Sequence, residues 1–115
     1  MRVAEESALS ERVGRVLELS SRALALASGE ESGQWEALAE VVAERQSAIE
    51  SVFALPLVES DFPKVREMAE SIRETDAEIF LLVKQKKQSI AQQSVALALG
   101  QLARSAYLAS ENDNL

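Results

Sequence analysis

The 115-residue chain contains no cysteine and no histidine, and it has only one Trp, one Tyr and three Phe. Without cysteine and histidine, the chain excludes disulfides, thiolate chemistry, zinc sites of the usual nitrogen and sulfur type, and most nucleophile-and-base pairs. The shortage of aromatic residues leaves Ala, Leu, Val and Ile to fill the interior, which is typical of helices packed on helices. We therefore expect an all-α protein that is not an enzyme and needs no cofactor.

The chain also lacks an excess of basic charge and any long apolar run. Its formal net charge is −7 and its pI is near 4.6, so it repels the phosphates of nucleic acids. The longest apolar run, Val52 to Val58, is interrupted by Pro56 and is far shorter than the roughly 20 residues of a membrane span. Glu5 and Glu6 stand where an export signal would begin its apolar core. These features predict a cytoplasmic protein with no nucleic acid partner and no membrane insertion.

Apolar residues recur at helical spacing along most of the chain. The periodicity predicts helices over about residues 5–27, 34–54, 61–93 and 95–109. The first two helices would be about 30 Å long, so an unbroken helix from residue 61 onward would extend far beyond the ends of both. We expect the chain either to fold back near Gly100 or to offer its surplus apolar face to another protein. Both alternatives indicate binding rather than catalysis.

Turn residues set the expected boundaries. The segment from Ser28 to Gly33 contains two glycines, which predicts a helix cap followed by a turn, and Pro56 ends the second helix. The polar stretch from Gln85 to Ser94, which ends in Gln92-Gln93-Ser94, predicts a loosening of the packing before the last helix. The expected fold is an antiparallel three-helix bundle over residues 1–94, with a separable, movable C-terminal helix and polar tail over residues 95–115.

Two charged residues interrupt the apolar seams of neighbouring helices. Arg45 lies on the seam of the second helix and Asp76 on that of the third. A pair between them would add little net stability but would define how the helices align. Each helical residue adds the same rise, so the number of residues between each side chain and the turn gives its height along the bundle. By this count, Arg45 and Asp76 are displaced from each other by about five residues along the helix axis. The alternative, that Arg45 extends its charge into water at the edge of the bundle, therefore stays open.

The remaining prominent side chains allow more than one reading. Trp35 begins the second helix beside the glycine turn, so we expect it to close one end of the core, with partner contact as the alternative. Tyr107 lies beyond any three-helix core, and core and partner roles are equally open for it. Two charge clusters are expected to be solvated helix faces: Lys84, Lys86 and Lys87, and the acidic ridge Glu67, Glu70, Glu74 and Glu78. The alternative for the lysines is a docking patch for an acidic partner, and the alternative for the ridge, a metal site, is disfavoured because the chain has no His to complete it.

Several short motifs follow one another in a set order along the chain. In the first half the motifs are Leu19-Ser20, Leu24-Ala25-Leu26-Ala27, the glycine turn, Trp35-Glu36-Ala37-Leu38 and Arg45. In the second half they are Ile72, Asp76, Ile79 and Leu82, then Gly100-Gln-Leu-Ala-Arg-Ser-Ala-Tyr107 and the terminal Asp113-Asn114-Leu115. In this order the motifs resemble the FliT family of flagellar type III export chaperones. The match spans most of the chain from Leu17 onward, and the turn from Ser28 to Gly33 departs from the family by its length.

The resemblance implies a cytoplasmic chaperone that binds the C-terminal helical region of the filament cap protein, FliD, and hands it to the export ATPase complex. It also implies that the fourth helix is a movable cover over the cargo groove. Some members of the family suppress the flagellar master transcription regulator, and nothing in this sequence shows that branch. The candidate partner-binding residues lie on the third and fourth helices: Ile72, Ile79, Val83, Ile90, Leu99, Leu102 and Tyr107.

A protein of another class remains as the alternative. The long third helices could form a homodimer, which would make the chain a self-assembling helical adaptor or structural bundle with no export cargo. The surplus apolar face serves self-assembly as well as it serves a helix-in-groove partner. Binding of a FliD C-terminal peptide distinguishes the two, because only the chaperone hypothesis predicts that complex.

Overall fold

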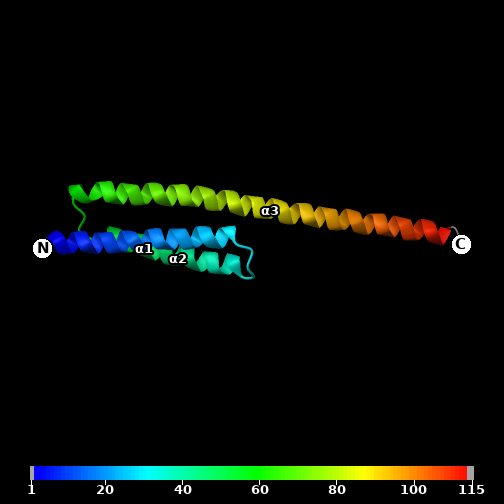
Figure 1. Cartoon of the computed structure of the whole chain (residues 1–115), viewed down its shortest axis with the longest axis horizontal. Coiled ribbons are helices and arrows are strands. Elements are labelled where there is room, and N and C mark those ends of the chain that lie inside the picture. Colours follow the sequence, from blue (N-terminus) through cyan, green and yellow to red (C-terminus); the bar gives the residue numbers. More distant parts are fainter. Residues whose placement is uncertain (1, 114–115) are drawn as a thin grey trace. The chain divides into compact units, whose positions relative to one another are not determined.

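A computed structural model describes residues 2–113 of the chain, with side chains for residues 5–106. It contains α1 (Arg2–Ser28), α2 (Gln34–Phe53) and α3 (Phe62–Asp113), with a short 3₁₀ turn over Glu59–Asp61 (Figure 1). No strand occurs in this part of the chain, so the expected all-α class is confirmed. Residues 1–82 form one compact unit and residues 83–115 another. Among the described residues, no helix combines the length and hydropathy needed to cross a bilayer.

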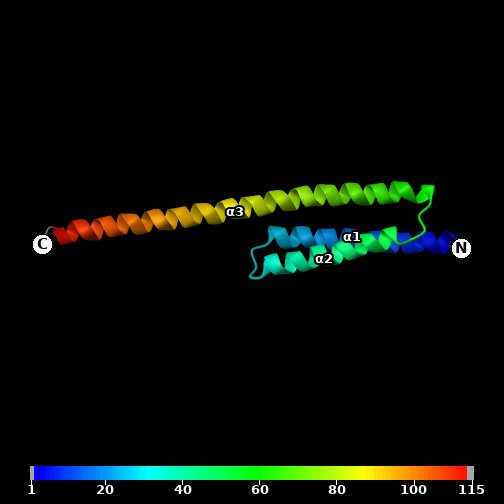
Figure 2. The same ribbon diagram turned by 180° about the vertical axis from the view of Figure 1, so that it is seen from behind.

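The turn between α1 and α2 follows from its small residues. α1 ends at Ser28, whose hydroxyl donates to the Leu24 carbonyl oxygen at 2.9 Å, and the Gly29 N–H donates to the Leu26 carbonyl oxygen at 3.2 Å. Gly33 precedes α2 with φ 77°, a left-handed conformation that residues with a Cβ rarely adopt. The turn therefore allows α2 to run back along α1, as Figure 2 shows for these two helices.

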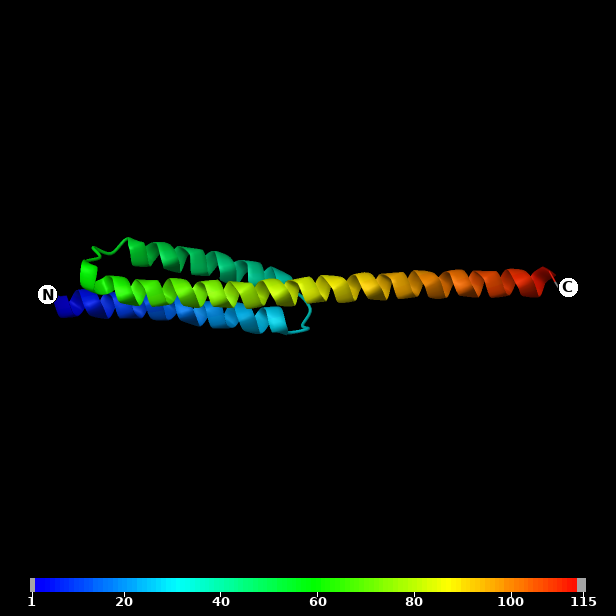
Figure 3. The same cartoon turned by 90° about the horizontal axis from the view of Figure 1, so that it is seen from above.

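The segment between α2 and α3 is longer than a simple reversal requires. The Asp61 carboxylate accepts the Val58 backbone N–H at 3.0 Å, and the Asp61 N–H donates to the Val58 carbonyl oxygen at 2.9 Å. Pro63 then lies in the first turn of α3, where its missing N–H removes no helical hydrogen bond. α3 begins beyond the end of α2 (Figure 3), so the connecting segment also shifts the chain along the helix direction.

The interior of residues 1–82 is built from small and aliphatic side chains of all three helices. One cluster centres on Val16, Val52 and Met68, with Val65 and Ile72 of α3 packed against it. The second cluster contains Leu19, Ala23, Ala27, Leu38 and Val41, with Ile79 and Leu82 of α3 against it. α1 and α2 approach each other closely, which the small side chains of Ser20, Ala23 and Ala27 permit.

Burial along α2 and α3 follows alternating steps of four and three residues. In α2 the buried or half-buried positions with this spacing are Gln34, Leu38, Val41, Arg45, Ala48 and Val52, and Ala37, Ile49 and Ser51 are half-buried beside them. In α3 the positions with this spacing are Val65, Met68, Ile72, Thr75, Ile79 and Leu82, and Ser71, Val83 and Lys86 are half-buried as well. This spacing keeps one face of each helix toward the core, because it averages close to the helical period.

α3 is one helix where the sequence predicts two. The expected end near residue 93, the restart at residue 95 and the reversal at Gly100 are wrong, because the helix continues through all of these positions. Gln is a good helix former, and a single Gly costs a helix only about 1 kcal/mol relative to Ala. The polar stretch from Gln92 to Ser94 therefore changes the side chains and leaves the backbone helical. Movement of residues 95–115, and a functional division after residue 94, stay predictions.

Candidate functional site

Every aromatic side chain among the described residues is substantially exposed to solvent. The exposed fractions are 41% for Trp35, 59% for Phe53, 50% for Phe62 and 67% for Phe80. The side chain of the fifth aromatic residue, Tyr107, lies outside the described residues. Aromatic side chains bury more apolar area than most others, and they are enriched where proteins bind one another. Four exposed rings in a chain so poor in aromatics therefore indicate a binding surface.

The two aromatic residues of α2 belong to a stripe directly beside its buried face. This α2 stripe consists of Trp35, Ala39, Val42, Gln46, Ile49 and Phe53. It repeats the four-and-three spacing of the buried positions, displaced by one residue, or about 100° around the helix. Ile49 is half-buried against the core and the other five are exposed, so the stripe offers a largely apolar surface to solvent.

The two aromatic residues described in α3 lie on a stripe with the same spacing, although three of its six residues are charged. This α3 stripe consists of Phe62, Arg66, Ala69, Arg73, Asp76 and Phe80, all of them exposed. Trp35 and Phe53 are 18 residues apart, and so are Phe62 and Phe80. Because 18 residues make about five turns, or about 27 Å, each stripe has an aromatic ring at both ends on the same side of its helix. Equal 18-residue spacing is the signal by which the sequence could have revealed both stripes.

An ion pair between α2 and α3 shows that the two stripes are neighbours. Arg45 Nη1 donates to Asp76 Oδ1 at 2.8 Å and lies 3.4 Å from the Ser20 hydroxyl oxygen. Arg45 is 7% exposed, whereas the side chain of Asp76 is 48% exposed and belongs to the α3 stripe. The structure therefore brings together the two charged residues that the sequence singled out. Arg45 Nε is buried without a hydrogen-bond partner, so its site is incompletely satisfied.

Contacts with α1 occupy the opposite sides of both helices. Arg15 approaches Glu44 at 3.5 Å, and Arg12 donates to the Ser51 carbonyl oxygen, so α1 lies on the side of α2 that carries Glu44 and Ser51. The α2 stripe is on the other side and therefore lies toward α3. On α3, Lys64 donates to the Ser10 hydroxyl at 2.7 Å, which likewise places α1 away from the α3 stripe. We call the two stripes together the α2–α3 face.

The α2–α3 face has the residue spacing of a surface that binds one more helix. Two neighbouring stripes with four-and-three spacing are the arrangement by which helices of a bundle accept a partner whose side chains fit between their own. The face offers no arrangement for acid–base or metal chemistry, and the described residues include no cluster of three or more possible metal ligands. Glu67, Glu70, Glu74 and Glu78 are each exposed on α3.

The seven candidate partner-binding residues do not form one surface. Ile72 and Ile79 are half-buried against the core, where packing accounts for their position. Within residues 83–115, Val83 is half-buried and Ile90 is exposed. Leu99 lies nine residues after Ile90, which places it on the opposite side of the helix. Leu102 is exposed on the side of Leu99, and a partner role for all seven residues, including Tyr107, stays a prediction.

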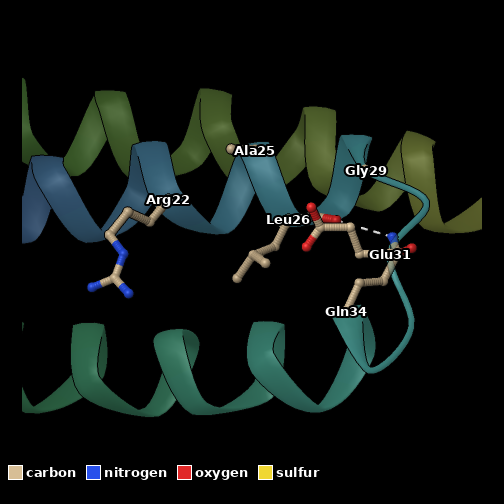
Figure 4. Close-up of a pocket in the computed structure, with 6 residues that line it drawn as sticks. All are labelled: Arg22, Ala25, Leu26, Gly29, Glu31 and Gln34. Carbon is tan, nitrogen blue, oxygen red and sulfur yellow. Dashed lines mark hydrogen bonds between the residues drawn. The ribbon is translucent and has the colours of Figure 1, made fainter.

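Residues at the α1–α2 turn surround an open cavity of about 330 Å³ (Figure 4). Gln34 closes this end of the core and is 7% exposed. Its side-chain Nε2 donates to the Leu26 carbonyl oxygen at 2.9 Å, and its backbone N–H donates to the Glu31 carbonyl oxygen at 3.2 Å. The expected role of Trp35 as the plug is therefore wrong. Gln34 takes that role because it, and not Trp35, is in phase with Leu38 and the rest of the buried face of α2.

Comparison with known proteins identifies a family but no individual relative. No curated protein and no solved structure is significantly similar to the chain. The model of the family described as flagellar protein FliT matches residues 10–109, which include α2, the described aromatic residues and most of α3. Since that match covers most of the sequence, the chain belongs to the FliT family of flagellar proteins.

Proposed function

We propose that this chain is a cytoplasmic export chaperone that holds the C-terminal helical region of the filament cap protein, FliD, and delivers it to the flagellar export ATPase. Membership of the FliT family, a family of flagellar chaperones, supports the general role. The observation that carries the proposal is the α2–α3 face, with exposed aromatic rings at both ends of two adjacent helical stripes. Such a surface binds an amphipathic helix through its apolar side.

In this mechanism the cargo helix lies along α2 and α3 and completes a four-helix arrangement. Its apolar residues, recurring every three or four positions, pack between the α2 and α3 stripes. Trp35, Phe53, Phe62 and Phe80 then lose their contact with water, and rings of this kind supply much of the energy at protein interfaces. The same contacts shield the apolar side of the cargo helix from aggregation until delivery.

Residues 95–109 are proposed to act as the cover. Val95, Leu99, Leu102 and Ala106 recur at four, three and four residues and are all exposed, so this segment has an apolar stripe of its own. The cover and the cargo compete for the same face, so binding of the cargo lowers the population of the covered state, and closing of the cover lowers the population of the cargo-bound state. This competition couples cargo binding to cargo release. Since a continuous helix cannot turn back on itself, this step requires α3 to open between Gln92 and Gly100.

A self-assembling bundle remains the second candidate because of one observation. Within residues 83–115, Ile90 and Leu99 leave apolar surface exposed on opposite sides of the helix. A homodimer through one of these sides would cover that surface. Suppression of a transcription regulator has no comparable support in the described residues, and it is not part of the proposal.

A FliD C-terminal peptide without tryptophan tests the proposed function directly. Trp35 is the only tryptophan and belongs to the face, so its fluorescence reports on binding. We expect the full chain to bind the peptide, and Phe53→Gln with Phe80→Gln to weaken binding by about tenfold or more, the usual cost of truncating aromatic hot spots. Leu17→Gln is the matched control, because Leu17 is 37% exposed on α1.

Two results would contradict the proposal. Equal binding by wild type and by the Phe53→Gln, Phe80→Gln variant would place the cargo elsewhere on the chain. Absence of peptide binding, together with sedimentation that depends on protein concentration, would favour the self-assembling bundle.

A further inference from the structure

We infer that the helix bound by the α2–α3 face carries two carboxylates about two turns apart, which Arg66 and Arg73 recognise. The inference rests on the proposed function, because it concerns the occupant of the same face. It adds the chemistry by which the chain distinguishes this occupant from other amphipathic helices, its own C-terminal segment included.

Arg66 and Arg73 are the two free cations of the face. Both are exposed members of the α3 stripe, and within the described residues neither makes an ion pair or a hydrogen bond. By contrast, Arg45 is held by Asp76, and Lys64 donates to Ser10. The two arginines therefore keep their full capacity to bind a partner.

The spacing of the two arginines sets the spacing of their partners. They are seven residues apart, which places them about 10 Å from each other along one side of α3. A guanidinium matches a carboxylate with two parallel hydrogen bonds, so each arginine prefers Asp or Glu to a neutral side chain. A helix that lies along α3 presents side chains at the same interval only when they are about seven residues apart.

The rest of the face restricts these carboxylates to one edge of the bound helix. The α2 stripe contains no charged residue, so an acidic edge turned toward α2 would lose hydration without gaining a partner. The occupant therefore has an apolar centre, an acidic edge against α3 and an uncharged edge against α2. This asymmetry selects one way for the helix to lie on the face.

The overall charge of the chain makes these two contacts selective. With a net charge of −7 the chain as a whole repels an acidic helix, so long-range electrostatic attraction does not favour the encounter with such partners. Recognition must occur at close range, because charges further apart than about 8 Å are largely screened at physiological ionic strength. An acidic helix without the correct spacing is therefore disfavoured.

The chain's own C-terminal segment cannot make these contacts. From Val83 to Ser110 the sequence contains no Asp and no Glu, and its charged side chains are Lys84, Lys86, Lys87 and Arg104. Glu111 and Asp113 follow, but they are only two residues apart and cannot match two arginines that are seven residues apart. A cover made from this segment matches the apolar part of the face and leaves Arg66 and Arg73 without partners. A cargo helix with two correctly spaced carboxylates therefore gains an advantage over the cover, and its arrival can displace it.

Three designed peptides test the inference on the full chain. They share one amphipathic helical sequence without tryptophan and differ at two edge positions, seven residues apart, which hold Glu, Gln or Lys. Trp35 fluorescence reports the affinity of each. We expect the Glu peptide to bind wild type roughly 2- to 30-fold more tightly than the Gln peptide, the range that two exposed ion pairs supply, with a ratio that shrinks as salt is added.

Charge reversal on the protein provides the sharper comparison. Arg66→Glu with Arg73→Glu should transfer the preference from the Glu peptide to the Lys peptide, whereas Arg22→Glu, at an exposed position on α1, should leave the order of the three peptides unchanged. Circular dichroism of each variant checks that the helices are retained.

The contrary outcomes separate this inference from the proposed function. Equal affinity of wild type for the Glu and Gln peptides overturns the role of Arg66 and Arg73 and leaves the helix-binding face standing. Failure of all three peptides to change Trp35 fluorescence overturns both. A Trp35 signal that changes with protein concentration alone identifies a second copy of the chain as the occupant and also overturns the inference.

Discussion

Arg45 and Asp76 meet although helix counting places them out of level. The connection from Ala54 to Asp61 explains the difference, because it moves the start of α3 along the helix direction before α3 begins. Arg45 reaches two helices at once, since its guanidinium lies near Ser20 of α1 as well as Asp76 of α3. The pair therefore relates all three helices at one level of the core.

Loss of this pair should destabilise the fold more than a typical surface change. We expect Asp76→Ala to lower the free energy of unfolding by about 1 to 3 kcal/mol, above the roughly 0.5 kcal/mol of surface substitutions. The cost stays below the 3 to 5 kcal/mol of a fully buried pair because the Asp76 side chain is 48% exposed. Urea unfolding of Asp76→Ala, Arg45→Ala and the double variant measures their coupling. Strictly additive effects would show that the two residues act independently.

At the scale of the element, α2 and α3 each carry two stripes displaced by one residue. The buried stripe holds the core together, and the neighbouring stripe carries the aromatic residues. In α2 the apolar residues extend over both stripes, so its apolar side is wider than a core of three short helices needs, whereas the second stripe of α3 combines two aromatic with three charged residues. That extra width is what makes the α2–α3 face available to another helix.

Gly100 lowers the helix propensity of the C-terminal part of α3. A Cβ added at Gly100 would meet no atom within 4 Å, and the residue lies inside a helix. Gly100→Ala should therefore favour helix at this position by about 1 kcal/mol. If the cover forms by opening α3 near Gly100, the variant should form it less often and bind cargo peptide up to about fivefold more tightly.

Circular dichroism and peptide titration of the Gly100→Ala variant measure these two effects separately. Gly14→Ala is the control, because it changes a glycine with equally open surroundings in α1, which takes no part in the cover. Higher helicity with unchanged cargo affinity would show that opening at Gly100 plays no role in binding.

At the scale of the whole molecule, the two compact units differ in how they are stabilised. Residues 1–82 contain both core clusters, whereas residues 83–106 expose most of their apolar side chains. Helices without tertiary partners are only marginally stable in water. The interactions that define the fold therefore lie in the first unit.

Removal of residues 95–115, most of the second unit, tests how far the fold depends on that unit. We expect the shortened chain to retain the folded three-helix core and to bind cargo peptide more tightly, because a competing cover has been removed. Thermal melts followed by circular dichroism measure the fold, and titration against the full chain measures the affinity. Collapse of the shortened chain would show that the C-terminal segment is an integral part of the core, and weaker cargo binding would show that it contributes contacts instead of competing.

Periodicity, turn residues and composition were enough to determine an all-α chain, the extents of α1 and α2, and the turn at Gly33, because these depend on neighbours in sequence. The motifs also led to the family that the comparison then showed. Tertiary structure decided the rest. Whether Gln34 or Trp35 is buried, whether Arg45 meets Asp76, and which side of α2 and α3 stays in water depend on where the other helices lie. A one-residue difference in phase rotates a helix by about 100°, and one sequence with two adjacent apolar stripes is compatible with either phase until its neighbours select one.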